Sequence, residues 1–214
     1  MGSSDVASRL LGRPGLRRLG SLLSRAALVF LFVFFAWANF AHWRSTGKPS
    51  GLGTTFLEGW AAILFLLRRT PDQLSLRPLA WFAAPIGSFA MLLARPHAGG
   101  LPHLFCELLQ LAGVLLALVS LATLGRSFGL VAANRGVKTH GPYRLVRHPA
   151  YTGYLVSYVG YVLENPAPAN VALLIISTAF QLLRISEEER LLVRDSAYAR
   201  YRASVRYRLV PRVY

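Results

Sequence analysis

Hydrophobic residues gather into six stretches along the 214-residue chain, separated by shorter polar segments. The first and fourth stretches approach the roughly 20 residues that an α-helix needs to cross the core of a bilayer, and the others are shorter. The pattern therefore predicts an all-α integral membrane protein with about six (five to six) transmembrane helices. These helices are expected at residues 24–43, 55–67, 79–94, 104–124, 150–163 and 171–183.

The composition supports this class of protein. Hydrophobic residues make up 54% of the chain and charged residues only 15%, whereas a soluble domain has about 25% charged residues. A disordered chain is excluded, and an ordinary soluble enzyme is disfavoured. Cys106 is the single cysteine, so neither an intrachain disulfide nor a multi-cysteine metal site can form, and no metal is expected.

Basic residues outnumber acidic ones by 24 to 9, which gives a net charge of +15. If all six stretches cross and the N-terminus is cytoplasmic, 21 basic residues lie inside, and only Arg44, Lys48 and Arg95 lie outside. The positive-inside rule favours this arrangement. A single missed or invented crossing would move every later loop to the opposite side of the membrane and destroy the asymmetry. We expect both ends in the cytoplasm. The basic residues flank helices, which favours lipid headgroups over nucleic acid as their partner.

Three segments differ in character. Residues 1–25 form a basic cytoplasmic segment whose Arg17-Arg18 pair also resembles a twin-arginine signal. The apolar run that follows is long for a cleaved signal, so we interpret it as a retained first helix. Residues 26–124 are expected to form a four-helix transmembrane portion. Residues 125–214 contain a polar loop, a helical hairpin broken at Asn165–Asn170, and a C-terminal segment.

The first four helices carry few candidate residues. Glu58 and Glu107 fall near the predicted outer ends of their helices, which favours acids that find water or a partner over functional carboxylates. His42, His97 and His103 lie at or beyond the outer ends and are interpreted as interfacial.

The helix predicted at 150–163 has two stripes. Tyr151, Tyr154, Tyr158 and Tyr161 form either an interfacial belt or the wall of a ligand cleft. Gly153, Ser157 and Gly160 form the other stripe, and small residues at this spacing let a neighbouring helix approach closely. We expect that neighbour to be the returning arm of the hairpin.

The last predicted helix continues into an acidic run. Glu187, Glu188 and Glu189 are consecutive in a strongly basic chain, and Arg184 precedes Glu188 by four residues. A solvated surface pair is one interpretation, and a site for a cationic partner is the other. His148 lies where the polar loop meets a helix, which is usually the place of a structural histidine.

Two separated motifs resemble a known family. The first is Gly141-Pro-Tyr-Arg-Leu-Val-Arg-His-Pro-Ala-Tyr-Thr-Gly153, and the second is Arg184-Ile-Ser-Glu-Glu-Glu189. Together with the tail residues Tyr198, Tyr201, Val205 and Leu209–Pro211, they resemble the isoprenylcysteine carboxyl methyltransferase family and its phospholipid methyltransferase relatives. The resemblance covers roughly residues 124–214.

The resemblance implies an integral-membrane enzyme that uses S-adenosyl-L-methionine, bound in a cytoplasm-facing pocket between the hairpin and the C-terminal segment. Arg184 would face the methyl acceptor. Lys138 departs from the Leu-Val-Thr run that the family often has at this position. Carried over by position, the cofactor contacts would be Arg135, Gly136, Val137, Lys138, Tyr143, His148, Pro149, Ala150, Tyr151 and Glu188, with Glu189, Arg126 and Tyr154 as further candidates.

The methyl acceptor is expected to be hydrophobic or lipid-linked. A carboxylate is already ionised at neutral pH and needs no general base, whereas an amine must first lose its proton. This favours carboxyl O-methylation, with N-methylation of a phospholipid amine as the alternative. An NADPH-dependent reductase, which shares only the Tyr-Arg-x-x-Pro-like tail, and a non-catalytic membrane protein also stay open. The Arg- and Ala-rich composition indicates a GC-rich bacterial genome and hence a bacterial inner membrane.

Overall fold

The computed structural model describes residues 14–71 and 73–213, with side chains from residue 22 onward. The fold is helical, as predicted, and the first thirteen residues of the expected basic segment lie outside the described part. Its α-helices are α2 (Pro14–Thr46), α3 (Pro49–Leu67), α4 (Pro78–Phe89), α5 (His103–Leu124), α6 (Pro149–Glu164), α7 (Pro168–Leu192) and α8 (Ser196–Ser204). The shorter elements are the 3-10 helices η1 (Ala90–Leu93), η2 (Gly125–Ser127) and η3 (Gly141–Arg144), and an antiparallel pair of strands, β1 (Gln73–Leu74) and β2 (Ala133–Asn134).

Prolines mark where several of these helices begin. Four of them, α3, α4, α6 and α7, have a proline in their first turn. Proline has no N–H and a fixed φ near −65°, so it suits a position whose N–H would have no partner inside the helix. The prediction that Pro149 begins a helix is confirmed.

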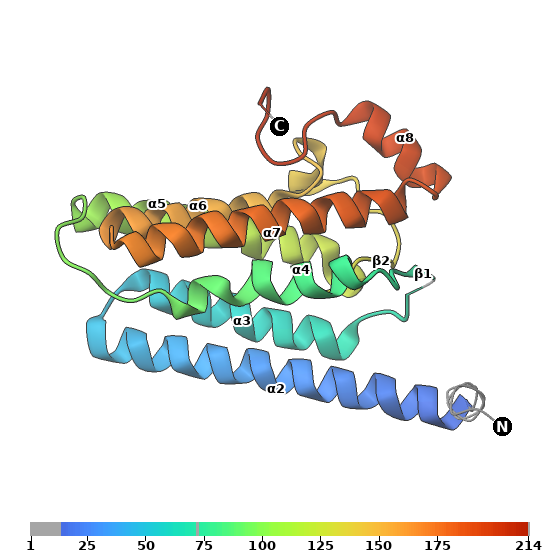
Figure 1. Ribbon diagram of the computed structural model, residues 1–214, viewed down its shortest axis with the longest axis horizontal. Coiled ribbons are helices and arrows are strands. Elements are labelled where there is room, and N and C mark those ends of the chain that lie inside the picture. The colour runs from blue at the N-terminus through green and yellow to red at the C-terminus, as the bar shows by residue number, and fades with distance from the viewer. Residues whose placement is uncertain (1–13, 72, 214) are drawn as a thin grey trace.

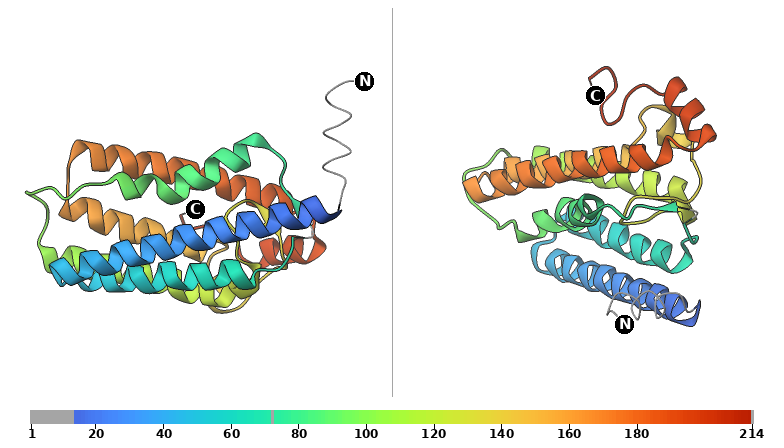
Figure 2. Two further views of the ribbon diagram at one scale, coloured as in Figure 1. Left: turned by 90° about the horizontal axis from the view of Figure 1, so that it is seen from below. Right: turned by 45° about the vertical axis from the view of Figure 1, so that its right-hand side comes forward.

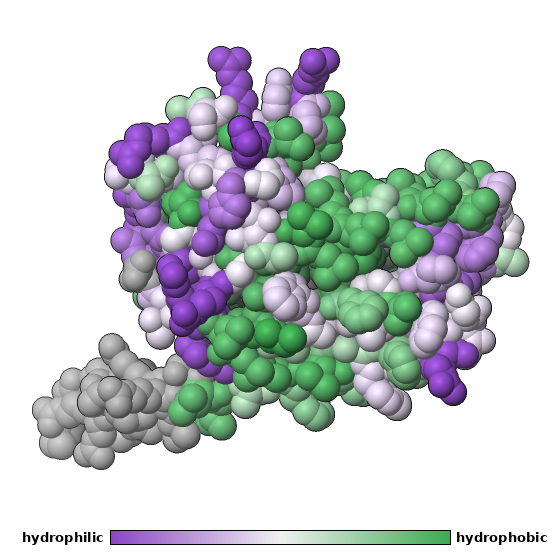
Figure 3. Space-filling view, turned by 180° about the vertical axis from the view of Figure 1, so that it is seen from behind, coloured by the Kyte–Doolittle hydropathy of each residue, from purple (hydrophilic) through white to green (hydrophobic). Residues whose placement is uncertain are grey.

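Several helices can cross a membrane. Leu22–Thr46, Pro49–Leu67, His103–Ser127 and Pro168–Leu192 are long and apolar enough, whereas the apolar Pro78–Leu93 is shorter. Figure 3 shows hydrophobic side chains gathered in a broad band, with hydrophilic ones toward the ends of the molecule. The chain is therefore an integral membrane protein, and the number of six spans stays a prediction.

The helices run back and forth along the long axis of the molecule (Figures 1 and 2). The connections 68–77 and 125–148 and the C-terminal segment lie at the end that carries α8, here called the α8 end. The connections 47–48, 94–102 and 165–167 lie at the opposite end. These are the two sets of connections that the charge count assigns to opposite sides of the membrane. Which end faces the cytoplasm stays a prediction.

The break between α6 and α7 is held by two asparagine side chains. Asn170 Nδ2 donates to the carbonyl oxygens of Asn165, at 2.8 Å, and of Arg95, at 2.7 Å. Asn165 Oδ1 accepts from the backbone N–H of His97 at 2.9 Å. These bonds satisfy backbone groups that the helix ends leave without partners. The predicted turn is confirmed, and it is tied to the connection between η1 and α5.

The glycine stripe of α6 packs on α5, so the prediction that it packs on the returning arm α7 is wrong. A Cβ at Gly153 would lie 2.6 Å from the backbone nitrogen of Ala117, and one at Gly113 would lie 2.4 Å from that of Ser157. Two glycines that face each other thus bring the backbones of α5 and α6 together. Figure 2 shows α7 beside α4, where the Gly87 carbonyl accepts hydrogen bonds from α7.

The start of α3 differs from the prediction and changes the place of Glu58. The helix begins at Pro49, six residues before the apolar stretch, and within it Thr54 and Thr55 bond back to the carbonyls of Ser50 and Gly51 at 2.8 Å. Glu58 therefore lies in the middle of α3 and not near its outer end. Glu107 does lie near the start of α5, four residues after His103, and is bonded by the backbone and hydroxyl of Ser50.

The close approach of α5 and α6 predicts a strong effect of Gly113→Ala. The added methyl group would meet the backbone of α6, which cannot move aside as a side chain can, so we expect a loss of about 1–3 kcal/mol of stability. Gly59→Ala is the matched control, because a Cβ there meets nothing within 4 Å and alanine favours a helix by up to about 1 kcal/mol. Thermal unfolding in detergent should show a lower Tm for the first variant only. Equal Tm values would contradict the packing.

Candidate functional site

A cavity lies at the α8 end, between the 125–148 segment, α6, α7 and α8. It encloses about 1240 Å³ of free space, part of it open to solvent. It brings together most of the residues that the sequence nominated, namely Arg135, Gly136, Val137, Lys138, Tyr143, His148, Ala150, Tyr151, Tyr154, Arg184 and Glu188. Of the remaining candidates, Pro149, Glu189 and Arg126 are not part of its lining.

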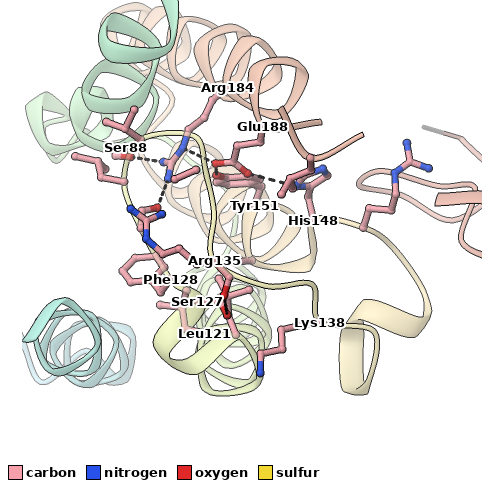
Figure 4. A pocket seen from close by; sticks show the side chains of 18 of the residues that line it. Ser88, Leu121, Ser127, Phe128, Arg135, Lys138, His148, Tyr151, Arg184 and Glu188 are labelled. Atoms are coloured by element: carbon pink, nitrogen blue, oxygen red, sulfur yellow. Dashed lines mark hydrogen bonds and ion pairs between the residues drawn. The ribbon is translucent and has the colours of Figure 1, made fainter. Parts of the chain in front are cut away.

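Arg184 is a cation of the cavity that three groups hold in place. Its guanidinium donates to Glu188 Oε1 from Nε at 3.2 Å, to Ser88 Oγ from Nη1 at 2.8 Å, and to the Gly129 carbonyl from Nη2 at 3.0 Å (Figure 4). It also lies over the ring of Tyr151, 5.0 Å from the ring centroid. Three of its five N–H groups are thus used, and two stay available for a ligand.

Glu188 faces the same cavity from the next turn of α7 (Figure 4). Tyr151 donates its hydroxyl to Glu188 Oε1 at 2.5 Å, and His148 Nδ1 lies 3.8 Å from Oε2. The His148 ring stacks on Tyr151 with the ring centroids 5.7 Å apart. The predicted pair of Arg184 and Glu188 is therefore part of a lined cavity and not a solvated surface pair.

Glu189, the next residue, is a structural hub behind the cavity. It is 4% exposed and accepts hydrogen bonds from Arg147 Nε at 2.7 Å, Arg208 Nε at 2.9 Å and the Tyr198 hydroxyl at 3.3 Å. His148 Nε2 lies 3.2 Å from the same carboxylate. A buried carboxylate with this many partners joins α7, the 125–148 segment, α8 and the C-terminal segment.

The C-terminal segment closes over the start of α6. The backbone N–H groups of Arg147 and His148 donate to the carbonyls of Tyr207 and Arg208 at 2.9 Å, and Thr152 Oγ1 donates to that of Leu209 at 2.8 Å. The Tyr201 hydroxyl donates to the Tyr143 carbonyl at 2.7 Å. Burial raises the pKa of Tyr143, so its phenol stays protonated at neutral pH.

The loop at 133–138 is shaped by short polar contacts. Asn134 accepts from the Gly136 backbone N–H through Oδ1 at 3.0 Å and donates to Asp195 through Nδ2 at 2.9 Å, which ties the loop to α8. Gly136 has φ +97°, a value that favours glycine. Ser127 Oγ donates to the Arg135 carbonyl at 2.9 Å. Figure 4 shows the amino group of Lys138 turned away from Arg184 and Glu188.

Arg135 lacks one hydrogen-bond partner. In the described part of the chain, its Nε is the buried side-chain nitrogen without an acceptor. Burial is the main cause that lowers its pKa to about 10, followed by the charge of Arg68, and it stays protonated at neutral pH. A buried guanidinium nitrogen without an acceptor is a candidate contact for an anionic group of a ligand.

Several lining residues were missed by sequence reasoning. They come from α2, α3, the last residues of α4, the 125–148 segment and α7. Apart from Arg147, which lies within the first motif, they are in segments where the sequence shows little chemistry. Glu58 offered the one visible signal, as an acid inside an apolar stretch. The missed lining residues include Phe32, Glu58, Ser88, Phe89, Phe128, Gly129, Arg147 and Gln181.

A second polar cluster lies at the opposite end. One ligand atom each of His103, Glu107 and Glu164 lies within 4.8 Å of the others, and His103 and Glu107 are four residues apart on α5, a spacing that sequence reasoning overlooked. Glu164 is already paired with Lys48 at 2.6 Å and His103 at 2.7 Å, and it accepts from Gln110 at 3.0 Å. The cluster therefore joins α3, α5 and α6 by ion pairs.

Fold and cavity define a helical membrane protein with a polar pocket at one end. The sequence model of the family described as phospholipid methyltransferase matches residues 102–199. Protein-S-isoprenylcysteine O-methyltransferase A of Arabidopsis thaliana is 38% identical over 92 residues, which are 40% of this chain and 46% of the relative. Residues 102–199 are therefore similar to the phospholipid methyltransferase family, which confirms the resemblance. The match spans about half the length of the curated relative.

Gly129→Ala should disturb Arg135. A Cβ at Gly129 would lie 2.4 Å from Arg135 Nη1, the far end of a flexible side chain, so the guanidinium must move, at a cost of no more than about 1 kcal/mol. Combining Gly129→Ala with Arg135→Ala should remove the clash. The Tm of the double variant should then equal that of Arg135→Ala alone. Additive losses of Tm would contradict this contact.

Proposed function

We propose that the chain is an S-adenosyl-L-methionine-dependent membrane methyltransferase that methylates a carboxyl group of a hydrophobic or lipid-linked acceptor. The observation that carries the proposal is the pairing of Arg184 with Glu188 on one wall of the cavity, because it offers a cation and an anion side by side. The family match of residues 102–199 and the isoprenylcysteine methyltransferase relative support the same reaction class.

The residues of the cavity suit the cofactor. S-adenosyl-L-methionine, when bound, supplies a methyl group on a sulfonium, which leaves as a neutral thioether once an acceptor oxygen takes the methyl group. Its ammonium and sulfonium carry positive charge, and Glu188 provides the compensating carboxylate. Its own carboxylate needs a cationic partner, and the buried Nε of Arg135 needs an acceptor. The 135–138 loop, Tyr143 and His148 border the space between these charges.

Arg184 would orient the acceptor carboxylate. Its two remaining N–H groups can donate to both oxygens of a carboxylate, which fixes the attacking atom. Ser88, Gly129 and Glu188 hold the guanidinium from three elements, so its direction is set before an acceptor binds. A carboxylate is ionised at neutral pH, so this reaction needs no side chain to remove a proton.

Transfer of radioactive methyl groups tests the reaction. Purified protein with [methyl-³H]S-adenosyl-L-methionine should label N-acetyl-S-farnesylcysteine or palmitate, and mild alkali should release the label as volatile methanol, because methyl esters hydrolyse and N-methyl groups do not. Phosphatidylethanolamine is the comparison acceptor. Alkali-stable label on this lipid would contradict carboxyl methylation and assign amine methylation instead.

Measurements of cofactor binding distinguish the role of Glu188 from that of the neighbouring Glu187. Glu188→Gln removes a charge that faces the cavity and should weaken S-adenosyl-L-methionine binding about 10-fold to 100-fold in calorimetry. Glu187→Gln is the matched control, since Glu187 pairs with Arg77 at 2.6 Å outside the cavity, and its affinity should equal that of the wild type. Tight binding of NADPH without binding of S-adenosyl-L-methionine would overturn the proposal.

Arg184→Lys tests the orientation of the acceptor. Lysine keeps the positive charge but cannot reach Ser88, Gly129 and Glu188 at once, so the fork geometry is lost. We expect kcat/KM for the acceptor to fall at least about 100-fold while cofactor affinity changes little. A variant with unchanged kcat/KM would show that Arg184 does not position the acceptor.

A further inference from the structure

A second cavity adjoins the one described above. It lies between α2, α3, α4, α5 and α6, extends toward Lys48 and Glu164 at the opposite end of the bundle, and encloses about 1060 Å³ of free space, part of it open. The two cavities share one set of wall residues, so they meet there. The shared residues are Glu58, Ser88, Phe89, Tyr154 and Tyr158.

Glu58 is the carboxylic acid among these shared residues. Within the described part of the chain, its carboxylate makes neither a hydrogen bond nor an ion pair, although it lies close enough to Tyr154 and Tyr158 to act on both phenols electrostatically. By contrast, Glu107 and Glu164, the acids at the opposite end, are each bonded by two or more groups.

The cations that line the two cavities near Glu58 are already engaged. Arg184 is held by Glu188, Ser88 and Gly129, and Lys48 is paired with Glu164. A carboxylate inside a membrane bundle is costly unless it is protonated or meets a cation. Among the described residues no cation is bonded to Glu58, so its carboxyl is either protonated or meets a cation that a ligand brings.

We propose that Glu58 binds the amino group of the acceptor, and that the second cavity holds the lipophilic part of the same molecule. This inference rests on the proposed function and deepens it, because it predicts that lipophilic acids with a free amine are preferred over those without one. Arg184 then meets the carboxylate and Glu58 the ammonium, so the charges of protein and acceptor complement each other. Tyr154 and Phe89 supply aromatic walls to both cavities.

A lipophilic carbodiimide tests the binding site without any methyl transfer. Dicyclohexylcarbodiimide forms a stable N-acylurea with a protonated carboxyl that it can reach from an apolar space. In protein held in lipid nanodiscs, peptide mass spectrometry should find this adduct on Glu58 and not on the paired Glu107. Dodecylamine should slow the labelling about 10-fold or more, and dodecan-1-ol at equal concentration should not.

Three results would overturn the amine site. They are a Glu58 that is not labelled, labelling that dodecylamine leaves unchanged, and equal protection by the alcohol, which would make the site one for any hydrogen-bond donor. Since this assay needs neither cofactor nor turnover, it can succeed even if the proposed methyl transfer fails.

A pair of acceptors tests the role of Glu58 in specificity. Wild-type protein should methylate S-farnesylcysteine with a kcat/KM about 10-fold to 100-fold above that for its N-acetyl derivative, whose amine carries no charge. Glu58→Gln should abolish this preference and keep its affinity for S-adenosyl-L-methionine, and Glu187→Gln should keep both. A preference that survives in Glu58→Gln would overturn the inference, whereas no methylation of either acceptor would count against the proposed function alone.

Discussion

The buried carboxylate of Glu189 is the interaction on which the α8 end of the molecule depends. Arg147, Tyr198 and Arg208 come from three different segments, and each donates to this one side chain. Removing one partner of such a buried group typically costs about 3–5 kcal/mol, because the remaining charges lose their compensation. Glu189 thereby fixes where the C-terminal segment lies, and two of its partners, Arg147 and Tyr198, line the cavity.

Glu188 and Glu189 show how consecutive residues of one helix take separate roles. Successive side chains on an α-helix point about 100° apart, so one carboxylate can face the protein interior while its neighbour faces a cavity. Glu189 is bonded on the interior side, and Glu188 meets Arg184 and Tyr151 at the cavity wall. The structural network places the charged pair, and the pair provides the chemistry that we propose.

Sequence patterns were sufficient for the helices and for most of the cavity lining. The apolar stretches indicate where the chain crosses the membrane. The two motifs contain His148, Arg184 and Glu188, which all line the same cavity. The start of α3 was not predicted because its first seven residues, 49–55, are mostly small or polar and show no apolar pattern. The helix that packs on the glycine stripe, α5, was not predicted either, since small residues permit close packing without determining which helix packs there. Glu58 consequently was placed at a helix end and not at the junction of two cavities.

Hydrogen–deuterium exchange with and without S-adenosyl-L-methionine tests the central claim most directly, because it reports which backbone segments a bound cofactor stabilises. The account predicts slower exchange at 133–148 and at 196–209, with little change in the connections 47–48 and 94–102 at the opposite end. Protection confined to the opposite end, or absent throughout in the presence of saturating S-adenosyl-L-methionine, would contradict it.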